Sequence, residues 1–245
     1  MINHVIKGAD SGTDIIFLHG FGGGIISFAY AARCMSKSCR TTLVDLYGFG
    51  ETPHMDRPMD LNDYVKSVEE IIRYYVMKNV ILVAHSFGGR VAIKLKAEGN
   101  DAVKKLVLCD SAGILPKRTS GYYIRVYIYK LLKKLRLKPN MGSADYKGLP
   151  EIMKKTFINI VNYDLKPCLR DIDCPTLIVW GEKDRETPMY MAEILNKNIR
   201  GSRLVVFEGC GHFAYIEDGY RFTKLLRGFV NEESHTEAAA EDLDA

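Results

Sequence analysis

Short apolar runs recur along the chain and alternate with longer segments whose apolar residues follow helical spacing. Apart from 3–7, which is expected to be a short edge strand, the runs hold continuous rather than alternating stretches of apolar and β-branched residues, which is typical of strands covered on both faces. They fall at residues 3–7, 14–19, 41–46, 79–84, 104–109, 175–180 and 203–207. Helical spacing occurs at residues 26–37, 61–77, 88–98, 188–198 and 218–230. This alternation predicts an α/β fold, in which helices cover both faces of a mostly parallel sheet.

The alternation stops over residues 114–167, where apolar and aromatic residues such as Tyr123 and Tyr127 keep helical spacing. Because this segment leaves after one strand and returns before the next, we interpret it as a helical cap over the strand ends. The remaining core then comprises residues 1–113 and 168–231. Residues 232–245 have little to bury, and we expect this tail to be disordered.

Charge is distributed unevenly around a formal net charge of +4. The cap segment holds 12 Lys/Arg against 3 Asp/Glu, whereas the tail holds six acidic residues and no basic one. A basic cap with six tyrosines suits an apolar or aromatic substrate that carries negative charge, although its lysines could equally face water. A basic amphipathic helix at 122–138 could contact a membrane surface. We expect no nucleic-acid partner, since no recognised binding module accompanies the charge.

Composition is ordinary for a globular protein, with 47% hydrophobic and 26% charged residues. No apolar run approaches the ~18 residues that cross a bilayer, and the first residues lack the pattern of a secretory signal. No two of the six cysteines have CxxC spacing, so a zinc or thioredoxin-like site lacks support. These observations predict a cytoplasmic protein without a metal site.

Ser86 stands between the expected strand 79–84 and the expected helix 88–98. Ala84 and Gly88 flank it at two residues on either side, which gives G-x-S-x-G with Ala in place of the first Gly. A sharp strand-to-helix turn needs small residues there, and it exposes the serine hydroxyl. The alternative is a serine that merely caps the helix. We predict that Ser86 is a nucleophile.

A serine nucleophile needs a base, usually histidine, which a carboxylate orients. His212 follows the last strand and is the predicted base. The competing histidines are His4, His19, His54, His85 and His235. His85 adjoins Ser86, so its side chain is expected to point away.

Asp184 is the predicted carboxylate, because it follows the strand 175–180 and precedes His212 by 28 residues. Glu182 and Glu186 are nearby rivals. Asp110, after the strand 104–109, is a more distant one.

A glycine-rich turn, His19-Gly20-Phe21-Gly22-Gly23-Gly24, ends the strand 14–19. Acyl transfer builds negative charge on an oxygen, which two main-chain N–H groups can hold. We predict that the N–H groups of Phe21 and Phe87 do so. The residues expected to contact the substrate are Gly20, Gly22, His85 and Phe213. The alternative is a flexible tight turn, whereas a nucleotide loop is excluded because no G-x-G-x-x-G opens a helix here.

These motifs together resemble the α/β-hydrolase family over about residues 14–230. The resemblance rests on His19-Gly20-Phe21-Gly22, the stretch 45–52, Ser86 in its turn, Trp180-Gly181-x-x-Asp184 and Gly211-His212. Serine, acid and histidine follow in the family's order. The resemblance implies an eight-stranded sheet, whose first edge hairpin would here be reduced to one strand. A serine nucleophile argues against the dehalogenase and epoxide-hydrolase branches.

The resulting hypothesis is a serine hydrolase, a carboxylesterase that cleaves small to medium acyl esters through an acyl-enzyme. It expects a small-molecule acyl substrate and no cofactor, and it leaves the oligomeric state open. One alternative is a hydrolase of carbon–carbon bonds in vinylogous diketones, but those enzymes often carry Trp after the catalytic histidine, where Phe213 stands here. The other is a non-catalytic, hydrolase-like receptor, which usually has lost a triad member.

Overall fold

The structure is a computed structural model, and it describes residues 1–8, 11–117 and 148–232. Seven strands of the described residues form one sheet in the order β1-β3-β2-β4-β5-β6-β7. Their bounds are β1 His4–Lys7, β2 Asp14–Leu18, β3 Arg40–Val44, β4 Val80–His85, β5 Val103–Cys109, β6 Thr176–Gly181 and β7 Ser202–Phe207. Only β1 is antiparallel to its neighbour within this sheet. The predicted mostly parallel sheet is confirmed, with β1 alone at the edge where the family resemblance implies a hairpin.

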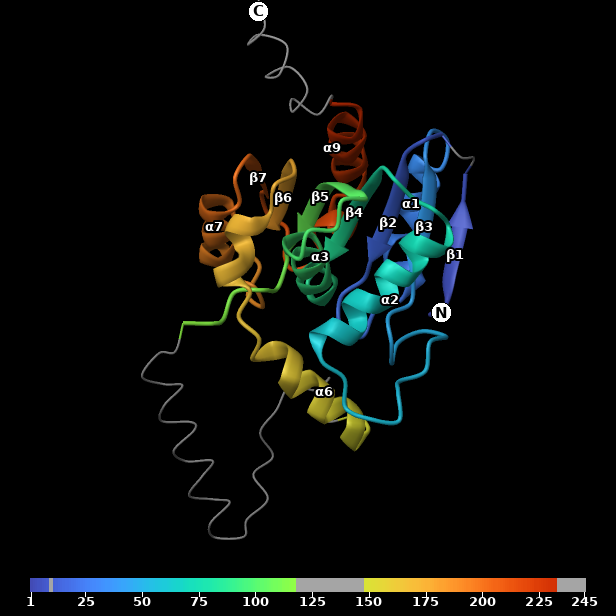
Figure 1. Cartoon of the computed structure of the whole chain (residues 1–245). Helices are drawn as coiled ribbons and strands as arrows, with labels where there is room; N and C mark the ends of the chain where they lie inside the picture. The colour runs from blue at the N-terminus through green and yellow to red at the C-terminus, as the bar shows by residue number, and fades with distance from the viewer. Residues whose placement is uncertain (9–10, 118–147, 233–245) are drawn as a thin grey trace, which may run out of the picture.

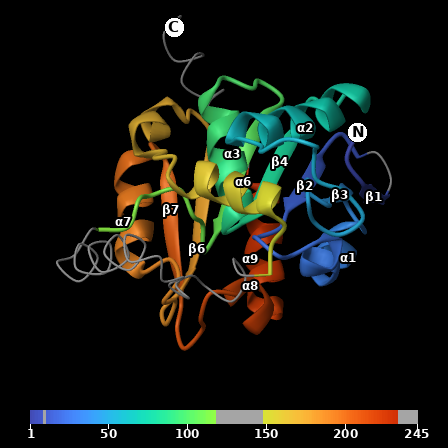
Figure 2. The same ribbon diagram turned by 90° about the horizontal axis from the view of Figure 1, so that it is seen from below.

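Helices cover both faces of this sheet, as Figures 1 and 2 show. In Figure 2, α2 and α3 lie above the sheet, whereas α1, α8 and α9 lie below it. The helices are α1 Ala29–Met35, α2 Leu61–Tyr74, α3 Phe87–Ala97, α6 Glu151–Val161, α7 Met189–Asn198, α8 Ala214–Glu217 and α9 Gly219–Asn231. Two 3-10 helices, η1 Ile25–Phe28 and η2 Lys166–Asp171, complete the described elements. The predicted helix 26–37 is therefore split between η1 and α1.

The central strands are apolar on both sides, which explains their continuous apolar runs. In β2, Ile16 and Leu18 pack into the core beneath α2, α3 and α7. Ile15 and Phe17 point the other way, into the core beneath α1 and α9. Successive side chains of a strand alternate between faces, so a strand between two helical layers needs apolar residues at every position.

The described part of the predicted cap is 114–117 and 148–167, which includes α6. Figures 1 and 2 place α6 across one end of the sheet, apart from the two helical layers. Thr156 and Asn159 of α6 bond to the main chain of Met59, at 2.9 and 3.1 Å. The predicted amphipathic helix 122–138 and five of the six cap tyrosines lie outside the described residues.

Arg90 fastens α6 to α3 beneath it. Its guanidinium is buried and donates to the carbonyls of Ile160 at 3.1 Å, Tyr163 at 2.7 Å and Val161 at 3.4 Å. These carbonyls belong to the last turn of α6 and the residues after it, where a cation also complements the helix dipole. The core therefore fixes this end of α6 over the strand ends.

Within residues 1–8, 11–117 and 148–232, we find no helix both long and apolar enough to cross a membrane.

Candidate active site

Three strand ends bring Ser86, His212 and Asp184 together. Ser86 directly follows β4, Asp184 follows β6 and His212 follows β7. The Nε2 atom of His212 lies 3.1 Å from the Oγ atom of Ser86, and its Nδ1 atom lies 2.8 Å from the Oδ2 atom of Asp184. A proton on Nδ1 satisfies both contacts, because Nδ1–H then donates to the carboxylate while Nε2 accepts from the serine hydroxyl. This arrangement matches the geometry of an activated serine.

Ser86 sits on a strained turn, with φ 46° and ψ −111°. A non-glycine residue with positive φ is uncommon, and such strain concentrates at functional sites. Gly88 makes the turn feasible, because a Cβ atom there would lie 2.4 Å from the carbonyl oxygen of Leu18. The small residue at this position therefore lets α3 approach β2 and hold the serine at the strand end.

The Asp184 carboxylate has a partner for each oxygen. Its Oδ1 accepts from the N–H groups of Glu186 at 2.8 Å and Thr187 at 3.0 Å. Its Oδ2 accepts from the Thr187 hydroxyl at 2.5 Å and from His212. Burial alone would raise the pKa of Asp184, but the hydrogen bonds from His212 and Thr187 leave that pKa below its usual value. Asp184 is thus held as an anion in one orientation. Thr187 is not among the site residues predicted from the sequence.

Burial would lower the pKa of His212, yet that pKa is raised above its usual value, mainly by its hydrogen bond and charge interaction with Asp184. Glu186 raises it further. The Oε2 atom of Glu186 lies 3.5 Å from the Nε2 atom of His212, and its side chain is 72% exposed. Glu186, one of the acids considered as an alternative to Asp184, therefore lies on the solvent side of His212, beside the Nε2 atom that faces Ser86.

We expect Glu186→Gln to shift the acid limb of the pH profile of kcat/KM to lower pH. His212, the predicted general base, must be neutral to accept a proton. Removing the Glu186 carboxylate lowers the pKa of His212, so its neutral form persists to lower pH. The shift should shrink in high salt, because Glu186 is exposed. Initial rates on the expected ester substrate between pH 5 and 9 measure the shift, with Glu193→Gln on α7 as the control for a lost exposed charge. An unmoved acid limb would contradict this role.

Asp110, the second rival acid, serves a different part of the site. It follows β5 with φ 44°, and its oxygens accept from the N–H groups of Gly181 at 2.7 Å and Ala214 at 3.2 Å. Burial raises the pKa of Asp110 to about 8. Asp110 therefore joins the end of β6 to the start of α8, while Asp184 is the acid hydrogen-bonded to His212.

The glycine-rich turn lies beside Ser86. A Cβ atom on Gly20 would lie 2.6 Å from the Nδ1 atom of His85 and 3.3 Å from the Cβ atom of Ser86. Gly22 has φ 75°, which only glycine adopts readily. The turn places Phe21 against Phe87 at a ring distance of 6.2 Å. The predicted oxyanion and substrate contacts of these residues remain predictions.

A cavity of about 550 Å³ opens onto Ser86. The described residues that line it are Phe21, His85, Ser86, Phe87, Arg90, Ala112, Phe157, Ile160, Val161, Glu186, Thr187, His212 and Phe213. Aromatic and aliphatic side chains from the turn and from α6 form much of its wall, as expected for a small-molecule site. Four predicted site residues, Phe21, His85, Phe87 and Phe213, line this cavity, whereas Arg90 and the α6 residues were not predicted from the sequence.

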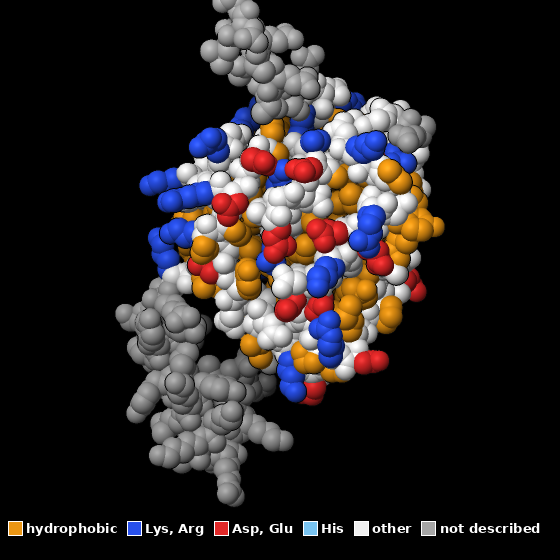
Figure 3. Space-filling model, viewed as in Figure 1, with side chains coloured by type: hydrophobic (Ala, Val, Ile, Leu, Met, Phe, Trp, Pro, Cys, Tyr) orange, Lys and Arg blue, Asp and Glu red, His pale blue; other side chains and the backbone are white. Residues whose placement is uncertain are grey.

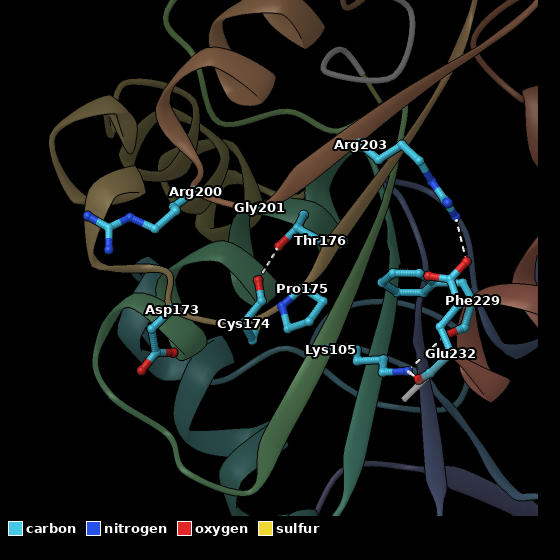
Figure 4. Close-up of a pocket in the computed structure, with 10 residues that line it drawn as sticks. All are labelled: Lys105, Asp173, Cys174, Pro175, Thr176, Arg200, Gly201, Arg203, Phe229 and Glu232. Carbon is cyan, nitrogen blue, oxygen red and sulfur yellow. Dashed lines mark hydrogen bonds and ion pairs between the residues drawn. The ribbon is translucent and has the colours of Figure 1, made fainter. Parts of the chain in front are cut away.

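A second cavity, of about 460 Å³, lies at the opposite, amino ends of β5, β6 and β7 (Figure 4). Lys105 and Arg203 point into this region together with Phe229 (Figure 4). The Nζ atom of Lys105 donates to the carbonyl of Phe229 at 2.9 Å, and Arg203 pairs with Glu232 at 3.2 Å. Its described lining holds neither serine nor histidine. These contacts stabilise the end of α9, and none of the described side chains that line this cavity is a predicted nucleophile or base. The cavity at Ser86 is therefore the candidate active site.

Acidic and basic side chains are interspersed over the described part of the face in Figure 3. Within residues 1–8, 11–117 and 148–232, we find no cluster of three or more His, Cys, Asp or Glu side chains able to hold a metal ion.

Comparisons with known proteins agree with this architecture. A model described as "Alpha/beta hydrolase family" matches residues 15–224. An AB hydrolase superfamily protein, YisY of Bacillus subtilis, is 32% identical over 90% of this chain and 92% of the relative. A 2-hydroxy-6-oxo-2,4-heptadienoate hydrolase of Pseudomonas putida is 27% identical over 90% of each chain. A solved esterase from Exiguobacterium antarcticum has a TM-score of 0.75 at 25% identity, covering 94% of this chain and 96% of that one.

Proposed function

We propose that this chain, which belongs to the alpha/beta hydrolase family, is a serine hydrolase that cleaves small to medium carboxylic esters. The observation that carries the proposal is the unbroken series of contacts from Ser86 through His212 to Asp184, at 3.1 and 2.8 Å, at the floor of a cavity. Such a series lowers the barrier to serine attack, because the base and its orienting acid are already aligned.

In this mechanism, Ser86 Oγ attacks the acyl carbon while His212 Nε2 takes the serine proton. Asp184 stabilises the imidazolium that forms. The N–H groups of Phe21 and Phe87 would hold the developing oxyanion. His212 then donates its proton to the departing alcohol. In deacylation His212 takes a proton from water, which attacks the acyl carbon. The bond from the acyl carbon to Ser86 Oγ then breaks, His212 returns the proton to Oγ, and the carboxylic acid departs.

Glu186 favours an ester over an acidic diketone. The Pseudomonas putida relative is named for an acid, 2-hydroxy-6-oxo-2,4-heptadienoate. In this chain, the exposed Glu186 carboxylate beside the Nε2 atom of His212 adds negative charge to the site, which disfavours binding of an anionic substrate. A neutral ester carries no such penalty.

Carbon–carbon bond hydrolysis of vinylogous diketones is the second candidate. Arg90 favours it, because a buried cation lines the cavity and could attract an acidic substrate. However, the guanidinium already donates to three carbonyls around the end of α6.

The two functions separate in one assay panel. We expect kcat/KM on p-nitrophenyl acetate, butyrate and octanoate to exceed that on a dienol diketone acid by at least about tenfold, the factor that ~1.4 kcal/mol of barrier height produces. Purified protein and absorbance assays for both substrate types are sufficient, with Ser86→Ala as the background control. The reverse order would make carbon–carbon hydrolysis the better assignment. No turnover of either class would favour the non-catalytic receptor.

A further inference from the structure

His85, the residue before the nucleophile, contacts the catalytic histidine. Its side chain is buried, with the residue 2% exposed, and its Nε2 atom lies 2.8 Å from the carbonyl oxygen of His212. Its ring lies 4.8 Å from the His212 ring and 5.0 Å from the Phe213 ring, between centroids. The expectation that His85 points away is therefore wrong: its ring reaches across to the loop after β7.

The contact fixes the protonation of His85. A carbonyl oxygen only accepts hydrogen bonds, so Nε2 must carry the proton and donate it. Burial lowers the pKa of His85 to about 3, so the ring stays neutral throughout the usual assay range. Its Nδ1 atom has no hydrogen-bond partner among the described residues and faces Gly20, where a Cβ atom would lie 2.6 Å away. The absence of a side chain at Gly20 thus leaves room for the His85 ring, which donates its Nε2–H to the His212 carbonyl.

The loop that carries His212 is held through its main chain on several sides. Glu217 accepts from the N–H groups of Gly211 at 2.9 Å and Phe213 at 3.4 Å. Asp110 accepts from Ala214 N–H on the far side. Glu217 and Asp110 thus hold the loop to α8 and β5, whereas His85 holds it to the residue that carries the nucleophile.

We propose that His85 is a positioning residue that sets the separation of His212 Nε2 and Ser86 Oγ. His85 and Ser86 are consecutive in the chain, and both contact His212. His85 donates a hydrogen bond to the main-chain carbonyl of His212, while the imidazole of His212 contacts the Ser86 hydroxyl. The position of His212 relative to Ser86 is therefore set from both its main chain and its side chain. Reactions of this kind lose about 10²-fold in rate for a displacement of about 1 Å. The inference rests on the proposed serine-hydrolase function.

Three substitutions distinguish the hydrogen bond from ring packing. His85→Gln can place an amide N–H near the position of Nε2, whereas His85→Asn is too short to reach the His212 carbonyl. His85→Phe keeps a ring against Phe213 but has no donor. We expect kcat on a p-nitrophenyl ester to stay within about threefold in His85→Gln and to fall about 10–100-fold in the other two, with KM changed less than about threefold in all three.

His4→Phe is the matched control for His85→Phe, because the Nδ1 atom of His4 also contacts a carbonyl oxygen, that of Ile2, at 2.8 Å on the far edge strand β1. We expect wild-type kcat for this control. Equal losses in His85→Gln and His85→Phe, or wild-type kcat in a folded His85→Asn, would overturn the inference. If His85→Asn does not fold, the comparison of His85→Gln with His85→Phe decides alone.

The rate of labelling by a fluorophosphonate separates this inference from the proposed function. Labelling needs an activated serine but no particular substrate. We expect wild type and His85→Gln to label Ser86 rapidly and His85→Phe to label it slowly. Rapid labelling of all three would refute the positioning role alone, whereas no labelling of folded wild type would refute the proposed function itself.

Discussion

Replacing Ser86 by alanine is expected to lower kcat on an acyl ester by about 10⁵-fold or more, while the protein still folds. The hydroxyl is the atom that attacks the substrate, and neither His212 nor the cavity can replace it. Initial rates on p-nitrophenyl butyrate measure the loss, and circular dichroism checks the fold. Retention of more than about 1% of wild-type kcat would contradict a serine nucleophile, since loss of a nucleophile costs far more than this factor of ~10².

The matched variant Ser86→Gly tests the strained turn independently of catalysis. Alanine keeps the backbone penalty at φ 46°, whereas glycine adopts positive φ freely. We therefore expect Ser86→Gly to be as inactive as Ser86→Ala but to have a higher Tm. Removing strain of this kind raises the free energy of unfolding by about 1–3 kcal/mol. The greater freedom of glycine in the unfolded chain lowers it by about 0.4–1 kcal/mol, so the net effect is stabilising. A lower Tm for the glycine variant would contradict stored strain.

Replacing Asp184 by asparagine should reduce kcat by about 10³–10⁴-fold. The N–H groups of Glu186 and Thr187 require an oxygen at the Oδ1 position, which places the new amide NH₂ opposite His212. That NH₂ donates to Nδ1 and moves the imidazole proton to Nε2, so the ring can no longer accept from Ser86. Steady-state rates at the pH optimum of the wild type measure the effect.

Asp110→Asn is the matched comparison. The new amide NH₂ group faces the backbone N–H of either Gly181 or Ala214, so one of the two hydrogen bonds is lost. This loss destabilises the protein by about 1–3 kcal/mol. We expect kcat to fall less than about tenfold, because Asp184 still orients His212. A greater kcat loss in Asp110→Asn than in Asp184→Asn would assign the orienting acid to Asp110.

The fold was predictable because it depends on patterns that are local in the sequence. The continuous apolar run at 79–84 needs only knowledge of which residues are apolar, and the observed β4 spans Val80–His85. The helix predicted at 26–37 differs more, because η1 ends at Phe28 before α1 begins. Apolar spacing alone does not separate a tight turn of helix from a regular one.

Ser86, Asp184 and His212 could be found because each lies within five residues of the end of a strand, and parallel strands deliver their carboxyl ends to one edge. Thr187 and Arg90 could not be found in this way. The contact of Thr187 with Asp184 depends on a turn geometry that four residues of sequence do not specify. In the sequence, Arg90 looks like an ordinary surface cation of a helix. Its carbonyl partners at the end of α6 lie about 70 residues later, and only the tertiary structure brings them together.

The most direct measurement of the central claim is the mass of the intact protein after treatment with a fluorophosphonate, followed by peptide mapping. An aligned Ser86, His212 and Asp184 predicts a single adduct on Ser86. The adduct should form more slowly as pH falls through the raised pKa of His212, because the protonated ring no longer accepts the serine proton. An adduct on another residue would contradict the assignment of Ser86 as the activated nucleophile. So would folded wild-type protein that acquires no adduct at any pH from 6 to 9.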